Sequence, residues 1–268
     1  MKLTFRVFVI SSMFALGSCA TNPFTGKQTM ALVSNDQLFP TSFKEYNDFL
    51  KSNKVIEGTP DAERITRIGQ RIAKAAETYL NANGHIGYLK GYQWEYHLIE
   101  DPQMNAWCMP GGKIVFYTGI LPVAKTDAGI AAIMGHEVAH ALANHGQQRM
   151  SAAYIQQGVA IAGNVAITDE QSRDMFNQYY GIGSNVAGML PFSRSHESEA
   201  DRIGIVLMAI AGYNPEAAPE LWTRMESSST PEFLSTHPSN ESRIASLNSL
   251  VSDAIAEAKK FGVTSFSE

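Results

Sequence analysis

The stretch TDAGIAAIMGHEVAHALANHG, from Thr126 to Gly146, is the part of this 268-residue sequence that decides the fold. Its apolar residues recur at steps of three and four, the period of an α-helix packed against a core. They are Ile130, Ile133, Met134, Val138, Ala141 and Leu142. Thr126 or Asp127 would cap the start of this helix, and residues 144–146 suit its end. We therefore predict a helix here, with one apolar stripe facing inward.

The helix carries an H-E-x-x-H motif at its centre. His136 and His140 are four residues apart, so both imidazoles project from one helical face and can reach a single metal ion. Two imidazole nitrogens suit Zn²⁺. Glu137 lies beside them and is placed to accept the proton of an attacking water. Because three fixed letters also arise by chance, the prediction of a zinc peptidase needs a third ligand.

The best candidate for that ligand lies on a second predicted helix, near residues 195–211. Glu197 and Asp201 are four apart there, so Glu197 can bind the metal while Asp201 orients a ligating histidine. The alternative is a solvated acidic helix start, which we expect for Glu199. His196 would point about 100° away from its neighbour around the helix. A metzincin is excluded, because Gly146 stands where that pattern needs histidine.

Four blocks of the sequence, in the same order, resemble one family of zinc metallopeptidases. They are NAWCMPGGKIVFYTGIL, HEVAH, PFSRSHESEADRIG and STHPSNESRI. The family includes the HtpX heat-shock protease, the CAAX prenyl proteases and the periplasmic BepA and LoiP proteases, and the resemblance covers roughly residues 60 to 250. The Trp107-Cys108 pair departs mildly from the usual pattern, away from the catalytic residues.

This resemblance implies a gluzincin. We expect a mainly helical α+β fold, with a small β-sheet packed beside the motif helix. The resemblance further implies one Zn²⁺ per chain, held by His136, His140 and Glu197. It makes Glu137 the general base and Asp201 the carboxylate behind a ligating histidine.

Strand-like residues at 92–100 and 113–117 flank a Pro-Gly-Gly turn at 110–112. Gluzincins bind substrate as an added strand at a sheet edge, and the candidate edge lies just before this turn. Its residues are Asn105, Ala106, Trp107, Cys108 and Met109. An ordinary buried hairpin is the alternative. Cys108 lies in an apolar run, so we interpret it as a small buried hydrophobe and not as a nucleophile.

His237 is a further candidate active-site residue. It could stabilise the oxyanion, in which case His237→Ala lowers activity, or it could occupy the open zinc position, in which case the same change raises activity. A structural hydrogen bond is the third interpretation. Arg243 could pair with the acids of the site. His85, His97 and His145 have no matched partner in the sequence, and we predict them to be surface or core residues.

Residues 1–18 have the charged start and the short apolar core of a secretory signal, too short to span a bilayer. Residues 16–19, LGSC, resemble a lipobox, which predicts acylation of Cys19 and membrane anchoring. By the same resemblance, Ala20 favours the outer membrane, with the protein facing the periplasm. A plain signal with an incidental cysteine is the alternative. We expect residues 19–40 to be a tether and residues 41–268 to form a single domain.

The formal net charge of −5 gives no reason to expect nucleic-acid binding. The partners we expect are polypeptides, such as misfolded or outer-membrane proteins handled in periplasmic quality control. Two other functions stay open, a chaperone-like assembly factor for envelope proteins with little proteolysis and a non-peptidase zinc hydrolase. Residues 152–167 read as an amphipathic or buried helix, because Gln156, Gln157 and Asn164 interrupt the apolar run.

Overall fold

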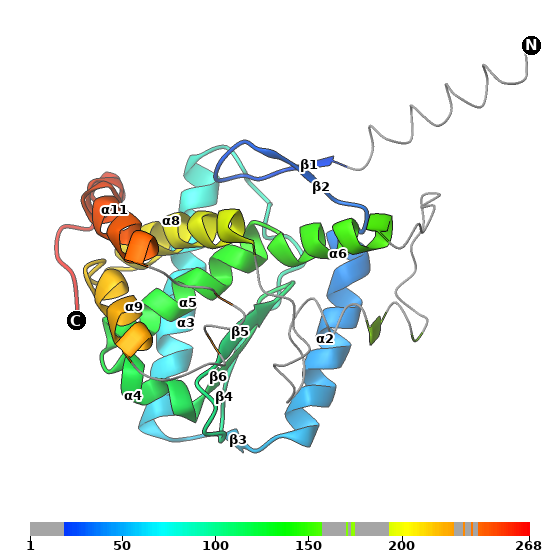
Figure 1. Cartoon of the computed structure of the whole chain (residues 1–268), viewed down its shortest axis with the longest axis horizontal. Coiled ribbons are helices and arrows are strands. Elements are labelled where there is room, and N and C mark those ends of the chain that lie inside the picture. The colour runs from blue at the N-terminus through cyan, green and yellow to red at the C-terminus, as the bar shows by residue number, and fades with distance from the viewer. Residues whose placement is uncertain are drawn as a thin grey trace, which may run out of the picture.

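The computed structural model describes residues 19–156, 193–227 and 241–268, together with residues 170, 173, 174, 233 and 237. The chain is mainly helical and has a small mixed sheet, which confirms the α+β prediction (Figure 1). The helices are α2 (Asn35–Ser52), α3 (Pro60–Ala82), α4 (Leu121–Ala124), α5 (Asp127–Leu142), α6 (His145–Gln156), α8 (Arg194–Ile210), α9 (Ala217–Ser227) and α11 (Glu241–Lys260). The strands are β1 (Cys19–Thr21), β2 (Gln28–Met30), β3 (Val55–Ile56), β4 (Glu95–Ile99), β5 (Ala106–Met109) and β6 (Lys113–Tyr117).

Helix α5, which carries the motif, begins where the sequence predicts. The Thr126 side chain accepts a hydrogen bond from the amide of Gly129 and caps the helix. The expected single apolar stripe is wrong, however, because every residue from Ala128 to Leu142 is buried. Helices α3, α8 and α9 and strand β5 all contact α5, which lies in the middle of the molecule (Figure 1). A helix enclosed on all sides has no solvent face to mark with polar residues.

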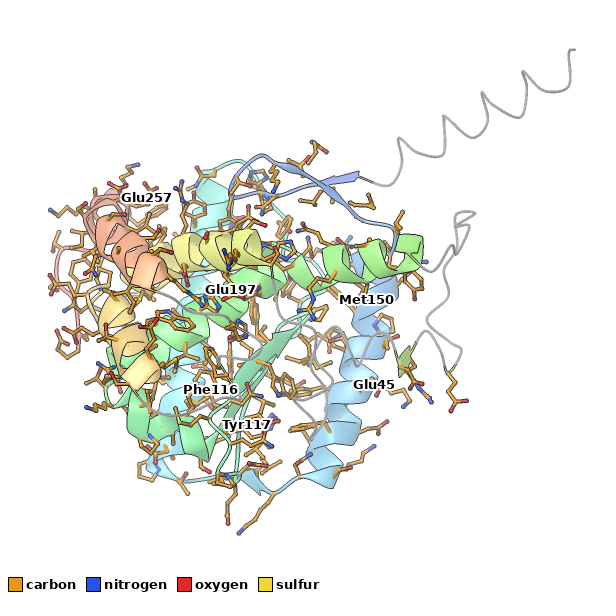
Figure 2. The ribbon with its side chains drawn as sticks, in the orientation of Figure 1. Glu45, Phe116, Tyr117, Met150, Glu197 and Glu257 are labelled. Carbon is orange, nitrogen blue, oxygen red and sulfur yellow. The ribbon has the colours of Figure 1, made fainter. Side chains whose placement is uncertain are left out.

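The larger sheet has the strand order β3-β4-β6-β5 and holds α5 on one face and α2 on the other. β4 and β6 are parallel, whereas β3 and β5 each run antiparallel to their neighbour. Side chains alternate along β6: Phe116 packs with α3 and α5, and its neighbour Tyr117 packs with α2 (Figure 2). β5 is thus an edge strand of this sheet, placed next to α5.

Helices α5 and α8 make backbone contact at a pair of facing glycines. A Cβ atom on Gly204 would lie 2.8 Å from the backbone nitrogen of His136, and one on Gly135 would lie 2.6 Å from the carbonyl oxygen of Gly204. Backbone atoms cannot rotate away as side-chain atoms do. The two glycines therefore set how closely the two helices approach each other.

We expect Gly204→Ala to destabilise the protein by about 1–3 kcal/mol, the usual magnitude for overpacking. Replacing glycine by alanine within a helix normally stabilises a protein by roughly 0.5–1 kcal/mol. The sign of the change in the free energy of unfolding therefore tests whether the close contact exists. Urea unfolding measures the effect. Ser198→Ala, at an exposed position of α8, is the control and should leave the midpoint nearly unchanged. An unchanged or higher midpoint for Gly204→Ala would contradict the contact.

The expected tether, residues 19–40, is wrong as a description of this segment, since its described residues are folded. β1 and β2 form an antiparallel hairpin, Phe24 stacks on Tyr79 of α3 at 5.3 Å between ring centroids, and α2 already begins at Asn35. A capping box formed by Ser34 and Gln37 starts that helix. The signal at residues 1–18 and most of the helix expected at 152–167 lie outside the described residues. Within the described part of the chain, no helix combines the length and apolarity needed to cross a membrane.

Candidate metal centre

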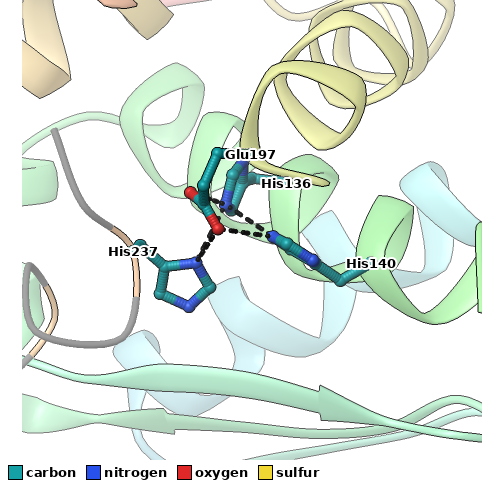
Figure 3. A group of neighbouring side chains, drawn as sticks. All are labelled: His136, His140, Glu197 and His237. Atoms are coloured by element: carbon teal, nitrogen blue, oxygen red, sulfur yellow. Dashed lines mark hydrogen bonds and ion pairs between the residues drawn. The ribbon is translucent and has the colours of Figure 1, made fainter. Parts of the chain in front are cut away.

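The two motif histidines point their Nε2 atoms at one location. These atoms lie 3.1 Å apart at the middle of α5, and both side chains are buried. Glu197 approaches from α8, with Oε1 3.3 Å from Nε2 of His140 and Oε2 3.4 Å from Nε2 of His136. Figure 3 shows the three groups facing one another between the two helices. Residues that are four and 57 positions apart in the sequence thus lie together at one buried site.

Glu197 occupies this position because of where α8 starts. Ser193 caps the helix by accepting a hydrogen bond from the amide of His196, so Glu197 falls in the first turn. One turn later, Asp201 Oδ1 lies 2.9 Å from Nδ1 of His136. The structure therefore places Glu197 beside the metal-facing nitrogens and Asp201 behind a histidine, as the sequence predicts, and their chemical roles stay proposals.

Arg243 holds both carboxylates from α11. Its Nε and Nη2 atoms each donate to Asp201 at 2.7 Å, and Nη1 lies 2.8 Å from Oε2 of Glu197. The guanidinium lies 3.4 Å from the ring centroid of Trp222 on α9, a close cation–π contact. The sequence had suggested that Arg243 could pair with the acids of the site. Trp222 was missed, because nothing near it in the sequence marks it as part of a site.

His237 joins the same group. Its Nδ1 lies 3.2 Å from Nε2 of His136 and 3.1 Å from Oε1 of Glu197 (Figure 3). One donor atom from each of His136, His140, Glu197 and His237 lies within 4.8 Å of the others. His237 therefore presents a fourth donor to the centre, in addition to the three that the sequence predicts as ligands.

Glu137 is buried beside this group. Its Oε1 lies 3.5 Å from Nε2 of His237 and accepts no hydrogen bond from any residue that the structure describes. Burial raises the pKa of Glu137, and the neighbouring histidines oppose this only in part. A buried carboxylate with a raised pKa and a free oxygen is suited to accept a proton.

The surroundings of the two motif histidines shift their pKa values in opposite directions. Burial lowers the pKa of His140 well below its ordinary value, so its ring is neutral. Burial also acts on His136, but hydrogen bonds to Asp201 and Glu197 outweigh it and raise the pKa to about 9. Glu197 is buried too, yet the surrounding histidines hold its pKa well below the usual range. The carboxylates thus create a site that favours positive charge at the centre of the pocket.

These residues fit a zinc ion. Two donors at 2.0–2.1 Å from a tetrahedral zinc lie about 3.3 Å apart. The five separations quoted above, between 3.1 and 3.4 Å, have this size, although they involve both oxygens of Glu197. One donor atom from each of the four residues lies within 4.8 Å of the others. Two or three imidazoles with one carboxylate are also a donor set that zinc commonly takes.

The candidate substrate strand lies at the sheet edge next to α5. β5 pairs with β6, and no other described strand pairs with its outer side. Trp107 turns toward α2 and stacks edge-on against Phe49, at 5.1 Å between ring centroids, while Ala106 faces the α5 side. The structure thus supplies an edge strand and leaves substrate binding as a prediction. Burial raises the pKa of Cys108 well above its ordinary value, which keeps it a thiol.

The sequence interpretation missed two residues next to the centre. His145, expected to be unpartnered, is fully buried, with Nδ1 2.9 Å from Nδ1 of His140 and Nε2 2.7 Å from Glu199 Oε2. Glu199, expected to be solvated, is the partner of that ring. The spacing of five residues between His140 and His145 was a signal in the sequence that could have suggested a contact between these two histidines.

Comparison with known proteins agrees with this geometry. The model of a family described as Peptidase family M48 matches residues 61–251. The chain is 35% identical over 174 residues to the mitochondrial metalloendopeptidase OMA1 of Schizosaccharomyces pombe, a match covering 63% of this chain and 50% of that protein. It is 28% identical over 181 residues to the beta-barrel assembly-enhancing protease of Escherichia coli, covering 62% of this chain and 37% of that protein.

The match to these relatives extends over half of their length or less. The family match, by contrast, covers most of this chain and includes both helices of the metal centre. It confirms the resemblance seen in the four sequence blocks. The chain belongs to peptidase family M48.

Proposed function

We propose that this protein is a zinc-dependent metalloendopeptidase that binds one Zn²⁺ per chain through His136, His140 and Glu197. The observation that carries the proposal is the convergence of these buried donors, with Glu137 beside them, whose Oε1 accepts no hydrogen bond from the described residues. When bound, zinc would act as a Lewis acid toward the substrate carbonyl and lower the pKa of an attacking water.

The residues of the chain supply the rest of the chemistry. Glu137 accepts the proton of the attacking water and returns it to the leaving amine, for which its raised pKa is suited. Asp201 accepts a hydrogen bond from Nδ1 of His136 and so leaves Nε2 of that ring free for the metal. Arg243 holds Asp201 and Glu197 in place.

For His237, the geometry favours the ligand role over the oxyanion role. Its Nδ1 lies among the metal-facing atoms at 3.2 Å from His136 Nε2, the separation expected of two ligands on one ion. We infer that His237 occupies the open position and holds the resting enzyme inactive. A substrate would have to displace this ring before reacting.

Substrate polypeptides would add to the sheet along β5, from Asn105 to Met109. The edge position of this strand and its contact with α5 support this role. Main-chain hydrogen bonds would supply affinity with little side-chain selectivity. Such a mode suits misfolded or outer-membrane polypeptides, the substrates we propose.

We further propose that the protein is a lipoprotein of the outer membrane, acylated at Cys19 and facing the periplasm. The LGSC pattern at residues 16–19 supports this location, as does the beta-barrel assembly named for the Escherichia coli relative. Our division of the chain is a signal at residues 1–18 and one peptidase domain beginning near residue 41, with the folded hairpin segment between them.

Metal analysis combined with a casein cleavage assay tests the proposed function. We expect one equivalent of zinc on the full chain, cleavage that a chelator abolishes, and recovery when zinc is restored. Zinc at 100 times its dissociation constant should also stabilise the fold by about 2.7 kcal/mol, measurable as a rise in Tm. One equivalent of bound zinc without any peptide hydrolysis, in the wild type and in His237→Ala alike, would contradict the proposal and favour a non-peptidase zinc hydrolase.

A further inference from the structure

The ring of His140 makes a second contact on the side away from the metal-facing atoms. Its Nε2 faces Glu197 and His136, and its other ring nitrogen points out of this group (Figure 3). That nitrogen, Nδ1, lies 2.9 Å from Nδ1 of His145. The far nitrogen of His145 lies 2.7 Å from Oε2 of Glu199. Three side chains thus form one line of hydrogen bonds leading away from the metal centre.

The backbone is shaped to bring His145 to this position. Helix α5 ends at Leu142 and α6 begins at His145, and between them Asn144 adopts a φ of 56°. This left-handed conformation is uncommon outside glycine, although asparagine is among the residues that tolerate it best. The helical backbone is thus interrupted just before His145, whose ring lies against His140.

Both ends of the Glu199–His145 pair are supported by further contacts. The ring of His196 stacks on His145, with 4.4 Å between centroids and 20° between planes. Oε1 of Glu199 accepts a hydrogen bond from the hydroxyl of Thr25 at 3.1 Å. His145 is fully buried, so a ring held in this way has little freedom to rotate. These contacts exceed what a histidine needs merely to fill space.

If His140 binds a metal through Nε2, the donors and acceptors along this line can be arranged in only one way. Its Nδ1 then carries the proton and donates to Nδ1 of His145. Nδ1 of His145 is therefore an acceptor, its proton sits on Nε2, and Nε2 donates to the Glu199 carboxylate. With a metal on Nε2 of His140, each of these two contacts thus has a defined donor and acceptor.

We propose that His145 and Glu199 are positioning residues that hold His140 in the tautomer and orientation needed to bind zinc. This inference rests on the proposed zinc site. On the other motif histidine, Asp201 accepts directly from Nδ1 of His136. His140 reaches its carboxylate through an intervening imidazole. Each motif histidine thus has its own carboxylate, and the two come from the same helix, α8.

Zinc affinity of the full chain, purified in detergent and measured by competition with a chromophoric chelator, tests the role of His145. His145→Leu removes the acceptor while keeping an apolar side chain in the space, and we expect it to weaken Zn²⁺ binding by about 10–100-fold. His145→Asn restores an acceptor for Nδ1 of His140 and should recover most of the affinity. His85→Leu, at a partly exposed histidine that is not among the four clustered donors, is the matched control and should bind zinc like the wild type.

Nitrogen NMR of the imidazoles provides a readout that packing alone would not move. In the zinc-loaded protein, His145 should be protonated at Nε2 and unprotonated at Nδ1. Glu199→Leu should leave the proton on Nε2, because Nδ1 of His145 still accepts from His140, but it should weaken Zn²⁺ binding, since Nε2 loses its acceptor. Glu199→Gln keeps an acceptor oxygen and should bind zinc nearly like the wild type. Weaker binding by Glu199→Leu but not by Glu199→Gln, with a normal circular dichroism spectrum, supports the proposal.

The outcomes separate this inference from the proposed function. If the wild type binds no zinc, both are overturned. If the wild type binds zinc but His145→Leu binds it equally well, or if His145→Asn is as weak as His145→Leu, the positioning role is overturned while the zinc site stands. A proton on Nδ1 of His145 in the zinc-loaded protein overturns it as well.

Discussion

Glu137→Gln is expected to lower the rate of peptide hydrolysis by about 10²–10⁴-fold, the usual contribution of a general base. Glutamine has nearly the same shape as glutamate, so the buried pocket beside His237 stays filled. The amide cannot accept a proton from water at neutral pH. Since Glu137 is not one of the proposed ligands, zinc binding should persist at one equivalent. A kcat measurement on a casein-derived peptide gives the loss of activity, and metal analysis of the same sample gives the zinc content.

The same variant distinguishes the peptidase from a chaperone-like assembly factor. Glu77→Gln, on the exposed side of α3, is the matched control and should leave hydrolysis unchanged. Comparing envelope fractions from cells with wild-type and Glu137→Gln protein would identify the polypeptides that accumulate without proteolysis. If misfolded clients are cleared equally well in both, the peptidase proposal loses its biological role. If Glu137→Gln hydrolyses peptides at the wild-type rate, Glu137 is not the base.

Arg243→Met is expected to destabilise the metal-free protein by about 3–5 kcal/mol, the magnitude for removing one partner of a buried ion pair. The guanidinium contacts two buried carboxylates, Asp201 and Glu197, which in Arg243→Met would lose this cation and keep only the neighbouring histidines. Methionine retains the packing against Trp222, so the loss reports on charge and hydrogen bonding. The variant should also bind zinc more weakly, because the carboxylates lose their fixed positions.

Urea unfolding of the metal-free proteins measures this effect without the contribution of bound zinc. Arg202→Met, the same substitution at an exposed position of α8, is the control and should shift the midpoint little. Arg243→Lys should fall between the wild type and Arg243→Met, because lysine restores the charge but not the two-pronged contact with Asp201. Equal midpoints for the Arg243→Met and Arg202→Met variants would show that the buried carboxylates do not depend on the guanidinium.

Much of the helical framework was predictable from local signals in the sequence. The Thr126 cap and the start of α3 next to Asp61 follow from cap chemistry and apolar period, which depend only on neighbours along the chain. The candidates His136 and His140 were predictable for a similar reason, and Glu197 was suggested by its position four residues before Asp201 and by the family resemblance. A spacing of four residues on a helix fixes a shared face, whatever the rest of the fold does.

Features that depend on contacts between distant segments could not be predicted in this way. The burial of α5 on every side follows from its enclosure by other elements, and the pairing of His145 with Glu199 joins two helices. The segment at 19–40 looked like a tether because Thr, Asn, Pro and Gly are frequent in it. Its hairpin is held by packing such as that of Phe24 on Tyr79, which no local pattern encodes.

The residues of the metal centre are far apart in the sequence, so the ribosome makes them at different times. Helix α5 brings His136 and His140 early, Glu197 follows on α8, and Arg243 comes last, on α11. A nascent chain that ends before α8 has two histidines on one helix and no third ligand. A chain that ends before α11 lacks the cation that neutralises the buried acids. On the proposed mechanism, proteolysis would therefore require nearly the whole domain, and an incomplete chain would pose little danger to the proteins around it.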